Sequence, residues 1–194
     1  MQLTPTLLLN AYSQGIFPMA HEDGSIDFYD PQPRAIIPLD EGFHVPRSLA
    51  RRIRRGGFEV RYDSAFRAVM EACAEPAPDR ESTWISPELI RVYCELHDLG
   101  FAHSVEIWLD DELAGGLYGV SIGGLFAGES MFSRATDTSK IALVYLVERL
   151  RERGFQLLDT QFLTPHLRRF GAVEISRRAY KARLDQALRG WTRF

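Results

Sequence analysis

Three polar residues stand in two of the most apolar, strand-like stretches of the sequence. Glu129 follows Gly-Leu-Phe-Ala-Gly in the segment GGLFAGESMFSR (123–134), where an apolar residue would continue the strand. Asp159 and Gln161 occupy positions i and i+2 of LLDTQFL, so on a regular strand both side chains point to one face. A buried carboxylate needs a partner, a raised pKa or a ligand. The trio is either a buried hydrogen-bond network or a catalytic site, and taken alone it favours the network.

Motifs of several enzyme classes are missing from the sequence. GESMF lacks the second glycine of a nucleophile elbow, which makes Ser130 a poor hydrolase nucleophile. No Walker A or G-x-G-x-x-G motif is present, and RRFGAV lacks the second glycine of the pyrophosphate loop of CoA-dependent acyltransferases. The histidines show no spacing typical of metal ligands: His21, His44, His97, His103 and His166. The sequence therefore favours a site without a metal.

The order of the expected elements predicts the fold class. A helix at 4–14, short segments between prolines and a basic helix after Pro46 open the chain. A helix with Ser86 as its N-cap, three apolar strands joined by tight turns, an amphipathic helix and a further strand follow. Their ranges are 86–100, 102–109, 113–122, 124–132, 137–154 and 155–163. Two basic helical segments end the chain. We predict an α+β (mixed α/β) fold with a mainly antiparallel sheet covered by helices, and a small N-terminal lobe.

Charge is distributed unevenly along a chain whose net charge is −3. Residues 42–58 hold five arginines and no acid, and residues 164–194 hold eight basic residues against Glu174 and Asp185. Either segment alone is typical of a solvated helix face, but the two together favour a surface for nucleic acid. No apolar stretch is long enough to span a membrane. Cys73 and Cys94 show no CxxC spacing, so we expect reduced core thiols in a cytoplasmic protein.

A series of motifs then identifies a family. AYSQGIFPM, DPQPRAIIP, STWISPELI, LHDLGFAHSVEIW, GGLYGV, AGESMFSR, SKIALVYL, DTQFL and GAVEISRRAY occur in this order. Together they resemble the leucyl/phenylalanyl-tRNA–protein transferases over nearly the whole chain, from about Thr4 to Tyr180. The most specific elements of the resemblance are GESMFSR and the strand with Asp-x-Gln.

The resemblance implies a fold and an activity. It implies the acyl-CoA N-acyltransferase (GNAT-like) fold, with a lobe at 1–60 that carries the basic helix and a catalytic domain at 61–194. It implies transfer of leucine or phenylalanine from charged tRNA to the α-amine of proteins that begin with Arg or Lys, and the departure from the family pattern at Met19 adds methionine as a further candidate donor. That addition creates an N-end-rule degradation signal. No cofactor is required, and we expect a monomer that binds no membrane.

The resemblance also assigns Glu129, Asp159 and Gln161 to the family's catalytic positions. The donor ester is already activated, so the enzyme has to hold an amine near an ester carbonyl, which can be worth ~7–11 kcal/mol. Gln161 would accept a hydrogen bond from the neutral amine, and Asp159 would orient the Gln161 amide. Glu129 would hold an amino group or the cationic acceptor terminus. The proton would pass to the leaving ribose oxygen.

Two further sets of residues follow from the family pattern. Candidates for the apolar donor pocket are Met19, Trp84, Leu117, Met131, Leu143, Leu146 and Leu150. By periodicity alone these are core residues, and Met19 stands where family members have Trp, so we expect altered donor preference. The basic helix PRSLARRIRR resembles the family's surface for the tRNA acceptor arm, with Arg47, Arg51, Arg52, Arg54 and Arg55 acting as a group.

Two other functions stay open. The chain could be another acyltransferase of the same fold, which uses acyl-CoA or adds amino acids to cell-wall peptides; the missing glycine loop argues against CoA. It could also be a non-catalytic RNA-binding module, although Asp159 and Gln161 are both present.

Overall fold

The structure of the protein is a computed structural model, which describes residues 3–21, 23–76 and 83–194. The helices and strands have the following order and bounds: α1 (Pro5–Ser13), β1 (Phe17–Ala20), β2 (Ile26–Tyr29), β3 (Arg34–Ile37), α2 (Arg47–Arg55), β4 (Glu59–Tyr62), α3 (Phe66–Ala74), α4 (Pro87–Asp98), β5 (Ala102–Leu109), β6 (Glu112–Ile122), β7 (Leu125–Ser133), α5 (Thr138–Glu152), β8 (Leu157–Gln161), α6 (Pro165–Arg168), β9 (Val173–Ile175) and α7 (Arg177–Leu188).

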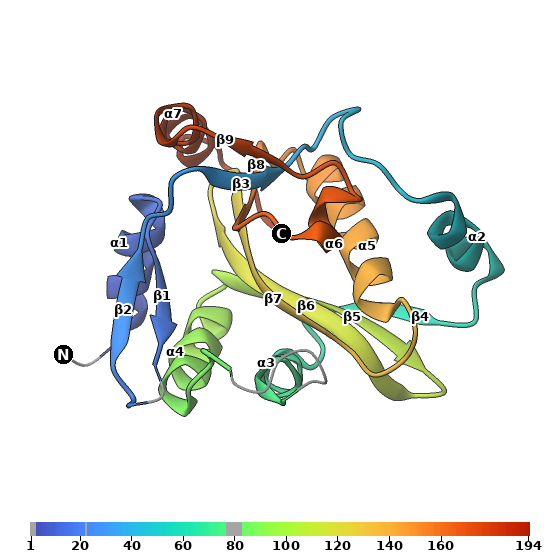
Figure 1. The fold of residues 1–194 in the computed structure, drawn as a ribbon. Helices are drawn as coiled ribbons and strands as arrows, with labels where there is room; N and C mark the ends of the chain where they lie inside the picture. Colours follow the sequence, from blue (N-terminus) through green and yellow to red (C-terminus); the bar gives the residue numbers. More distant parts are fainter. Residues whose placement is uncertain (1–2, 22, 77–82) are drawn as a thin grey trace.

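The central feature is a sheet that, within the described ranges, has seven strands in the order β4-β5-β6-β7-β8-β3-β9 (Figure 1). Strands β1 and β2 pair separately as a two-stranded sheet. Neighbours in the large sheet are antiparallel except β7 and β8, which are parallel. The parallel pair is possible because α5 supplies the long crossover that such a pair needs. The predicted α+β class with a mainly antiparallel sheet is confirmed.

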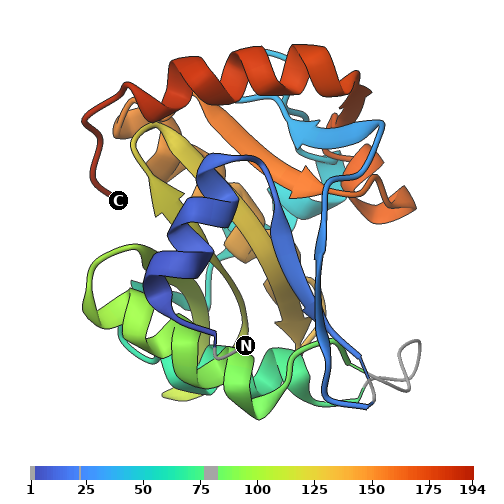
Figure 2. The same cartoon turned by 90° about the vertical axis from the view of Figure 1, so that its left-hand side faces the viewer.

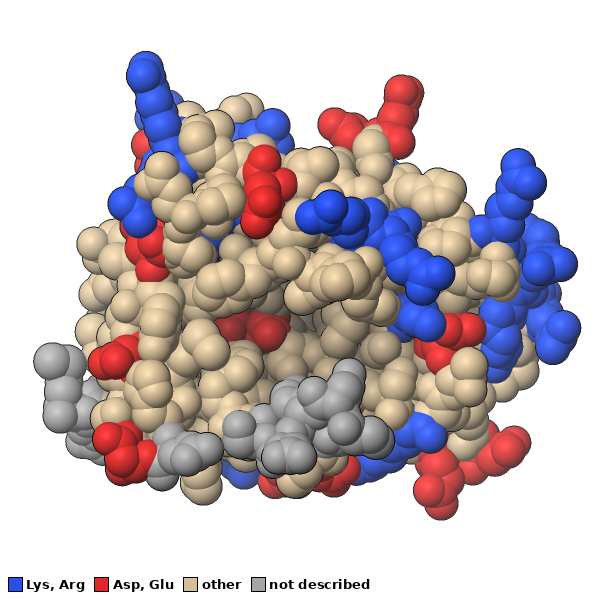
Figure 3. All heavy atoms as spheres, in the orientation of Figure 1, with Lys and Arg blue, Asp and Glu red and all other residues tan. Residues whose placement is uncertain are grey.

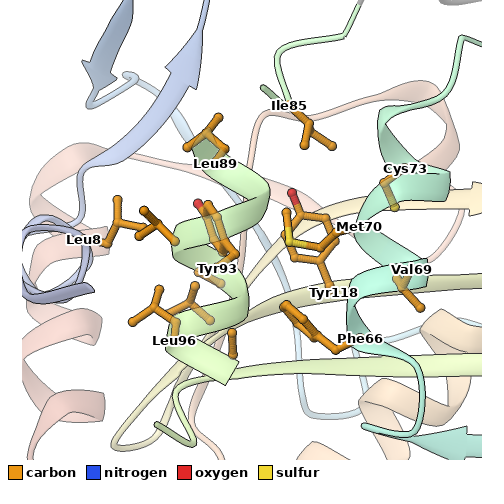
Figure 4. Close-up of a cluster of buried hydrophobic side chains, with 14 of the residues drawn as sticks. Leu8, Phe66, Val69, Met70, Cys73, Ile85, Leu89, Tyr93, Leu96 and Tyr118 are labelled. Carbon is orange, nitrogen blue, oxygen red and sulfur yellow. The ribbon is translucent and has the colours of Figure 1, made fainter. Parts of the chain in front are cut away.

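Helices cover the sheet and form the core with it. Helix α5 packs against β5, β6 and β7, whereas α3 packs against the same three strands with the side chains of a second core cluster. Helix α4 packs on α3 and β5, and α1 packs on α4. Figure 4 shows Leu8 of α1 beside Leu89, Tyr93 and Leu96 of α4. Helix α7 packs against β7 and β8, at the top of the view in Figure 2.

The helix that was expected at 86–100 is α4. The Ser86 hydroxyl oxygen accepts a hydrogen bond from the main-chain N–H of Leu89 at 3.3 Å, so Ser86 is its N-cap. Helix α1 begins in the same way, because Thr4 Oγ1 accepts from the N–H of Leu7. Of the two basic segments at the C-terminus, α6 is a single turn and α7 is a full helix, and the short strand β9 between them was not predicted.

Strand β3 has the most unexpected position. Its flanking prolines limit it to four residues, as the sequence indicated, but it is an interior strand between β8 and β9 and all four residues are buried. The division into a lobe at 1–60 and a domain at 61–194 stays a prediction; β3, from the first of these ranges, pairs inside the large sheet. In the part of the chain that the structure describes, no helix combines the length and the apolar character needed to cross a membrane.

Candidate active site

A cavity of about 660 Å³ opens where β7 and β8 separate. The two strands pair at Leu125–Leu157, Phe126–Leu158 and Ala127–Asp159, and the register printed for the described strands ends there. Beyond that point β7 continues toward Ser133 while β8 ends at Gln161. The residues that line the cavity come from β1, the segment before α4, β6, β7, α5, β8, the segment that leads into α6, and α6 itself. Figure 3 shows the hollow on this face, with an acidic side chain inside it.

Glu129 is the acidic residue of the cavity lining, and a bulge in β7 places it there. In the β6–β7 ladder Tyr118 pairs with Ser130 and Gly119 pairs with Gly128, so Glu129 has no partner residue in β6. A bulge of this kind re-aims a side chain and is common beside active sites. It explains why a carboxylate interrupts an apolar strand: at this position the strand is irregular.

The Glu129 carboxyl lies against two buried tyrosines. Tyr12 and Tyr93 each form a hydrogen bond with the Glu129 carboxyl, which lowers its pKa, and the two hydroxyl groups are also hydrogen-bonded to each other. Burial has the larger effect and, with the nearby Asp159 carboxylate, it raises the pKa of Glu129 to about 8. The pKa values of Tyr12 and Tyr93 are raised by burial, so both hydroxyls stay protonated. Their two protons supply two of the three bonds, and the Glu129 carboxyl can donate in the third when it is protonated.

Asp159 is buried and has four donors. Arg34 Nε donates to Oδ1 at 2.9 Å and Arg34 Nη2 to Oδ2 at 2.6 Å, in a forked pair. The Tyr180 hydroxyl donates to Oδ2 at 2.9 Å, and the main-chain N–H of Gln161 donates to Oδ1 at 3.0 Å. Asp159 is not among the residues that line the cavity. It contacts Gln161 through the main chain, whereas the expected contact was with the side-chain amide.

Gln161 reaches the cavity because the end of β8 is irregular. Its φ is +60°, in the left-handed region, and the register with β3 skips one residue between Asp159 and Gln161. Its side-chain Nε2 lies 3.5 Å from Glu129 Oε1. The two residues thus meet across the opening between the strands. Alternation of strand faces predicted that Asp159 and Gln161 point to one face of the sheet. In the structure Asp159 contacts Arg34 and Tyr180, whereas the irregular end of β8 aims Gln161 at the cavity.

The residues expected for the donor pocket fall into two groups. Six of them line the cavity together with Phe17, Phe162 and His166: Met19, Trp84, Leu117, Met131, Leu143 and Leu146. Leu150 does not line the cavity and is fully buried in the core cluster around α5. It lies one helical turn beyond Leu146, on the same stripe of α5, so periodicity alone could not separate pocket from core.

Sequence reasoning missed the residues that support the polar groups: Tyr12, Arg34, Tyr93 and Tyr180. The tyrosines stand at helical spacing among apolar residues and have the pattern of ordinary core residues. Arg34 stands in DPQPRAIIP, and its charge directly before an apolar run was the one sequence feature that could have marked it as a buried residue. A signal for its partner was absent, because Asp159 is 125 residues away in the chain.

The expected tRNA-binding arginines form a cluster away from the cavity. Arg47, Arg51, Arg54 and Arg55 are exposed, whereas Arg52 is half-buried and donates to the Gly56 carbonyl at 2.6 Å. No acidic side chain of the described residues forms an ion pair with any of the five. Figure 3 shows basic side chains gathered over α2 and others over α6, between α2 and the hollow. The exposed Arg168 and Arg169 lie at the end of α6.

Comparison with known proteins finds family models and relatives that match most of the chain. The family model "Leucyl/phenylalanyl-tRNA protein transferase" matches residues 36–185, and the model of the N-terminal domain of the same family matches residues 1–32. A leucyl/phenylalanyl-tRNA–protein transferase of Herpetosiphon aurantiacus is 63% identical over 187 residues, which are 96% of this chain and 95% of that protein. One from Paramagnetospirillum magneticum is 57% identical over 96% of this chain and 90% of that protein.

Similarity to solved structures is more distant. The L-PGS of Bacillus licheniformis aligns with a TM-score of 0.44 and 17% identity, over 84% of this chain and 61% of that one. The family assignment rests on the sequence matches, which extend over both the cavity and the arginine cluster. The chain therefore belongs to the leucyl/phenylalanyl-tRNA–protein transferase family.

Proposed function

We propose that the protein transfers leucine or phenylalanine, with methionine as a further donor, from charged tRNA to the α-amine of proteins that begin with Arg or Lys. The observation that carries the proposal is one cavity in which Glu129 and Gln161 face a largely apolar wall. An apolar wall suits a leucyl or phenylalanyl side chain, and the two polar groups lie beside it, where an amine and an ester could meet.

Gln161 is the group that faces the attacking amine in this proposal. Its amide nitrogen is directed to Glu129, which leaves the amide oxygen to accept a hydrogen bond from the amine. Attack forms the C–N bond and breaks the bond between the acyl carbon and the ribose oxygen. The amine proton passes to that oxygen as it leaves, so no side chain has to keep a proton.

Glu129 receives the cationic acceptor. Burial raises the pKa of its carboxyl to about 8, so in the empty site Glu129 binds its proton more tightly than a free glutamate does. A bound Arg or Lys side chain or α-ammonium group favours the charged form and lowers that pKa. Binding of a basic N-terminus is thereby coupled to release of a proton from Glu129, and a neutral or acidic N-terminal residue lacks this gain.

The tRNA would approach over the arginine cluster of α2. The exposed Arg47, Arg51, Arg54 and Arg55 supply phosphate contacts, which give affinity with little sequence readout. Arg168 and Arg169 extend the basic surface to the end of α6, and the other residues of this single turn border the cavity. The acceptor end could follow this surface from α2 to the site.

The remaining expectations are proposals of the same kind. We propose a GNAT-like fold, supported by an antiparallel run of strands followed by a parallel pair that separates at the cavity. We also propose the division at residue 60, a monomer and a cytoplasmic location.

The test mixes the purified protein with Leu-, Phe- or Met-charged tRNA and peptides that begin with Arg, Lys, Asp or Ala. Mass spectrometry then reports peptides that gain one residue. We expect gain on Arg and Lys peptides, and a strongly reduced but measurable rate of gain with the Gln161→Ala variant at equal tRNA binding. Salt-sensitive binding that ignores whether the tRNA is charged, without gain on any peptide, would instead identify an RNA-binding module. Gain with acyl-CoA as donor would identify another acyltransferase.

A further inference from the structure

Arg34 is a fully buried cation that joins five parts of the structure, one of which is Asp30 after β2, whose Oδ1 lies 3.8 Å from Arg34 Nη1. Its side chain is 1% exposed. Besides the forked pair with Asp159 on β8, its Nη1 donates to the Gly15 carbonyl at 2.8 Å, just after α1. The guanidinium lies 5.0 Å from the ring of Phe17 on β1 and 4.4 Å from the ring of Tyr180 on α7. Of Arg34 and the residues that it contacts, only Phe17 lines the cavity.

A buried ion pair of this kind contributes little net stability. Removing two charges from water costs several kcal/mol per ion, and a protein in which apolar residues of similar volume replace such a pair is often equally stable. A forked pair does fix direction, because two parallel hydrogen bonds set the plane and rotation of the carboxylate. The Tyr180 hydroxyl adds a third donor, so the Asp159 carboxylate is held in one orientation.

That orientation matters because Asp159 Oδ1 also accepts the main-chain N–H of Gln161. Gln161 has a φ of +60°, which is costly for a residue with a Cβ and persists only where surrounding groups determine it. The N–H bond to Oδ1 ties this conformation to the carboxylate. The same conformation aims the Gln161 side chain at Glu129 and the cavity.

We propose that Arg34 is a positioning residue of the transfer reaction: it orients Asp159, and Asp159 holds the main chain of Gln161 so that its amide faces the substrate. Asp159 then acts through the main chain of Gln161 and contacts neither donor nor acceptor. Tyr180 supports the same carboxylate from α7. The inference rests on the proposed transfer activity.

The test is a double-mutant cycle on turnover at saturating charged tRNA. Arg34→Lys keeps the charge but loses the fork, and Gln161→Ala removes the group that Arg34 is proposed to position. We expect Arg34→Lys to lower kcat at least tenfold while KM for charged tRNA changes less than twofold. In the Gln161→Ala background the same change should lower kcat less than twofold, because nothing remains to be positioned.

A matched control separates positioning from general damage. Arg61 makes the same forked pair with the exposed Glu59 on the edge strand β4, with bonds of 2.8 and 2.7 Å. Arg61→Lys should leave kcat unchanged in both backgrounds. If Arg34→Lys does not fold, Tyr180→Phe removes a single donor from Asp159. It should lower kcat about two- to fivefold, again only when Gln161 is present.

A second measurement does not depend on turnover. Hydrogen exchange of the Gln161 main-chain amide should be at least tenfold faster in Arg34→Lys, or twofold in Tyr180→Phe, than in the wild type. The proposal would be overturned if the loss of kcat in the double variant equalled the product of the losses in the two single variants. An unchanged exchange rate of the Gln161 amide would overturn it as well. A wild-type protein without any transfer activity would reject the proposed function instead, and the exchange measurement would still decide whether Arg34 holds Gln161.

Discussion

The raised pKa of Glu129 leads to a measurable dependence of stability on pH. In the folded protein the pKa is about 8, against 4.5 for an unperturbed glutamate, so the folded state binds this proton more tightly than the unfolded chain does. The contribution to stability is complete below about pH 4.5 and is lost as the pH rises to about 8. Glu129→Gln keeps the shape of the protonated side chain and removes the titration.

The magnitude follows from the size of the shift. A difference of about 3.5 pKa units at 1.36 kcal/mol per unit corresponds to at most ~5 kcal/mol. The side chain of Glu129 is partly exposed to the cavity, and solvent there stabilises the charged form. We therefore expect the contribution of Glu129 to the free energy of unfolding to fall by about 2 kcal/mol between pH 5 and pH 9.

The assay is urea unfolding of the wild type, Glu129→Gln and a control, Glu174→Gln, at several values between pH 5 and pH 9. Glu174 is exposed on the edge strand β9. The free energy of unfolding of Glu129→Gln should rise relative to the wild type by about 2 kcal/mol across this range, since the wild type alone loses the contribution. The control should run parallel to the wild type.

Parallel curves for the wild type and Glu129→Gln would refute the reasoning. Such a result would mean that Glu129 is already charged at neutral pH in the empty site. The coupling between binding of a basic N-terminus and release of a proton would then be lost as well, although Glu129 could still attract a cation.

Three other predictions concern the cavity, the arginine cluster and the sheet. Leu143→Ala should enlarge the cavity and raise the ratio of kcat/KM for Phe-charged tRNA to kcat/KM for Leu-charged tRNA by about tenfold. Leu150→Ala should leave this ratio unchanged and lower the free energy of unfolding, measured in urea, by about 2–5 kcal/mol. The double change Arg51→Glu and Arg54→Glu should raise KM for charged tRNA at least tenfold and flatten its salt dependence, with the unfolding midpoint unchanged. Gly119→Ala would place its Cβ 2.3 Å from a β7 carbonyl oxygen, and we expect a loss of about 3 kcal/mol by urea unfolding.

Each of these has a result that contradicts it. An equal donor ratio in the two leucine variants would mean that the cavity does not hold the donor side chain. An unchanged KM after charge reversal would move the tRNA away from α2. Wild-type stability in Gly119→Ala would mean that β6 and β7 can separate there without cost.

The sequence was sufficient for elements whose signals are local. Ser86 and the apolar periodicity after it predict α4, and the run from 102 to 132 predicts the three adjacent strands β5, β6 and β7. Both signals come from neighbouring residues, where capping and face alternation act. The position of Glu129 was noticed for the same reason, because it breaks a local apolar pattern.

The sequence was not sufficient where short segments pair over long distances. Strand β3 has four residues, and its place between β8 and β9 depends on partners more than a hundred positions away. The pair of Arg34 and Asp159 forms only after that insertion. Nor does alternation predict a bulge or a left-handed residue, since both are decided by the packing around them.

These two irregularities together make the site. The bulge at Glu129 and the turn at Gln161 lie on neighbouring strands just beyond their last paired residues, so both side chains enter the space between the strands. Each is stabilised by buried polar groups, and the first helix with the residue that follows it contributes to both, through Tyr12 of α1 beside Glu129 and through the Gly15 carbonyl after α1 that accepts from Arg34. This first helix therefore supports both polar groups of the proposed site although it lies outside the central sheet. A variant that displaces α1 should disturb Glu129 and Gln161 together, because the two supports share it.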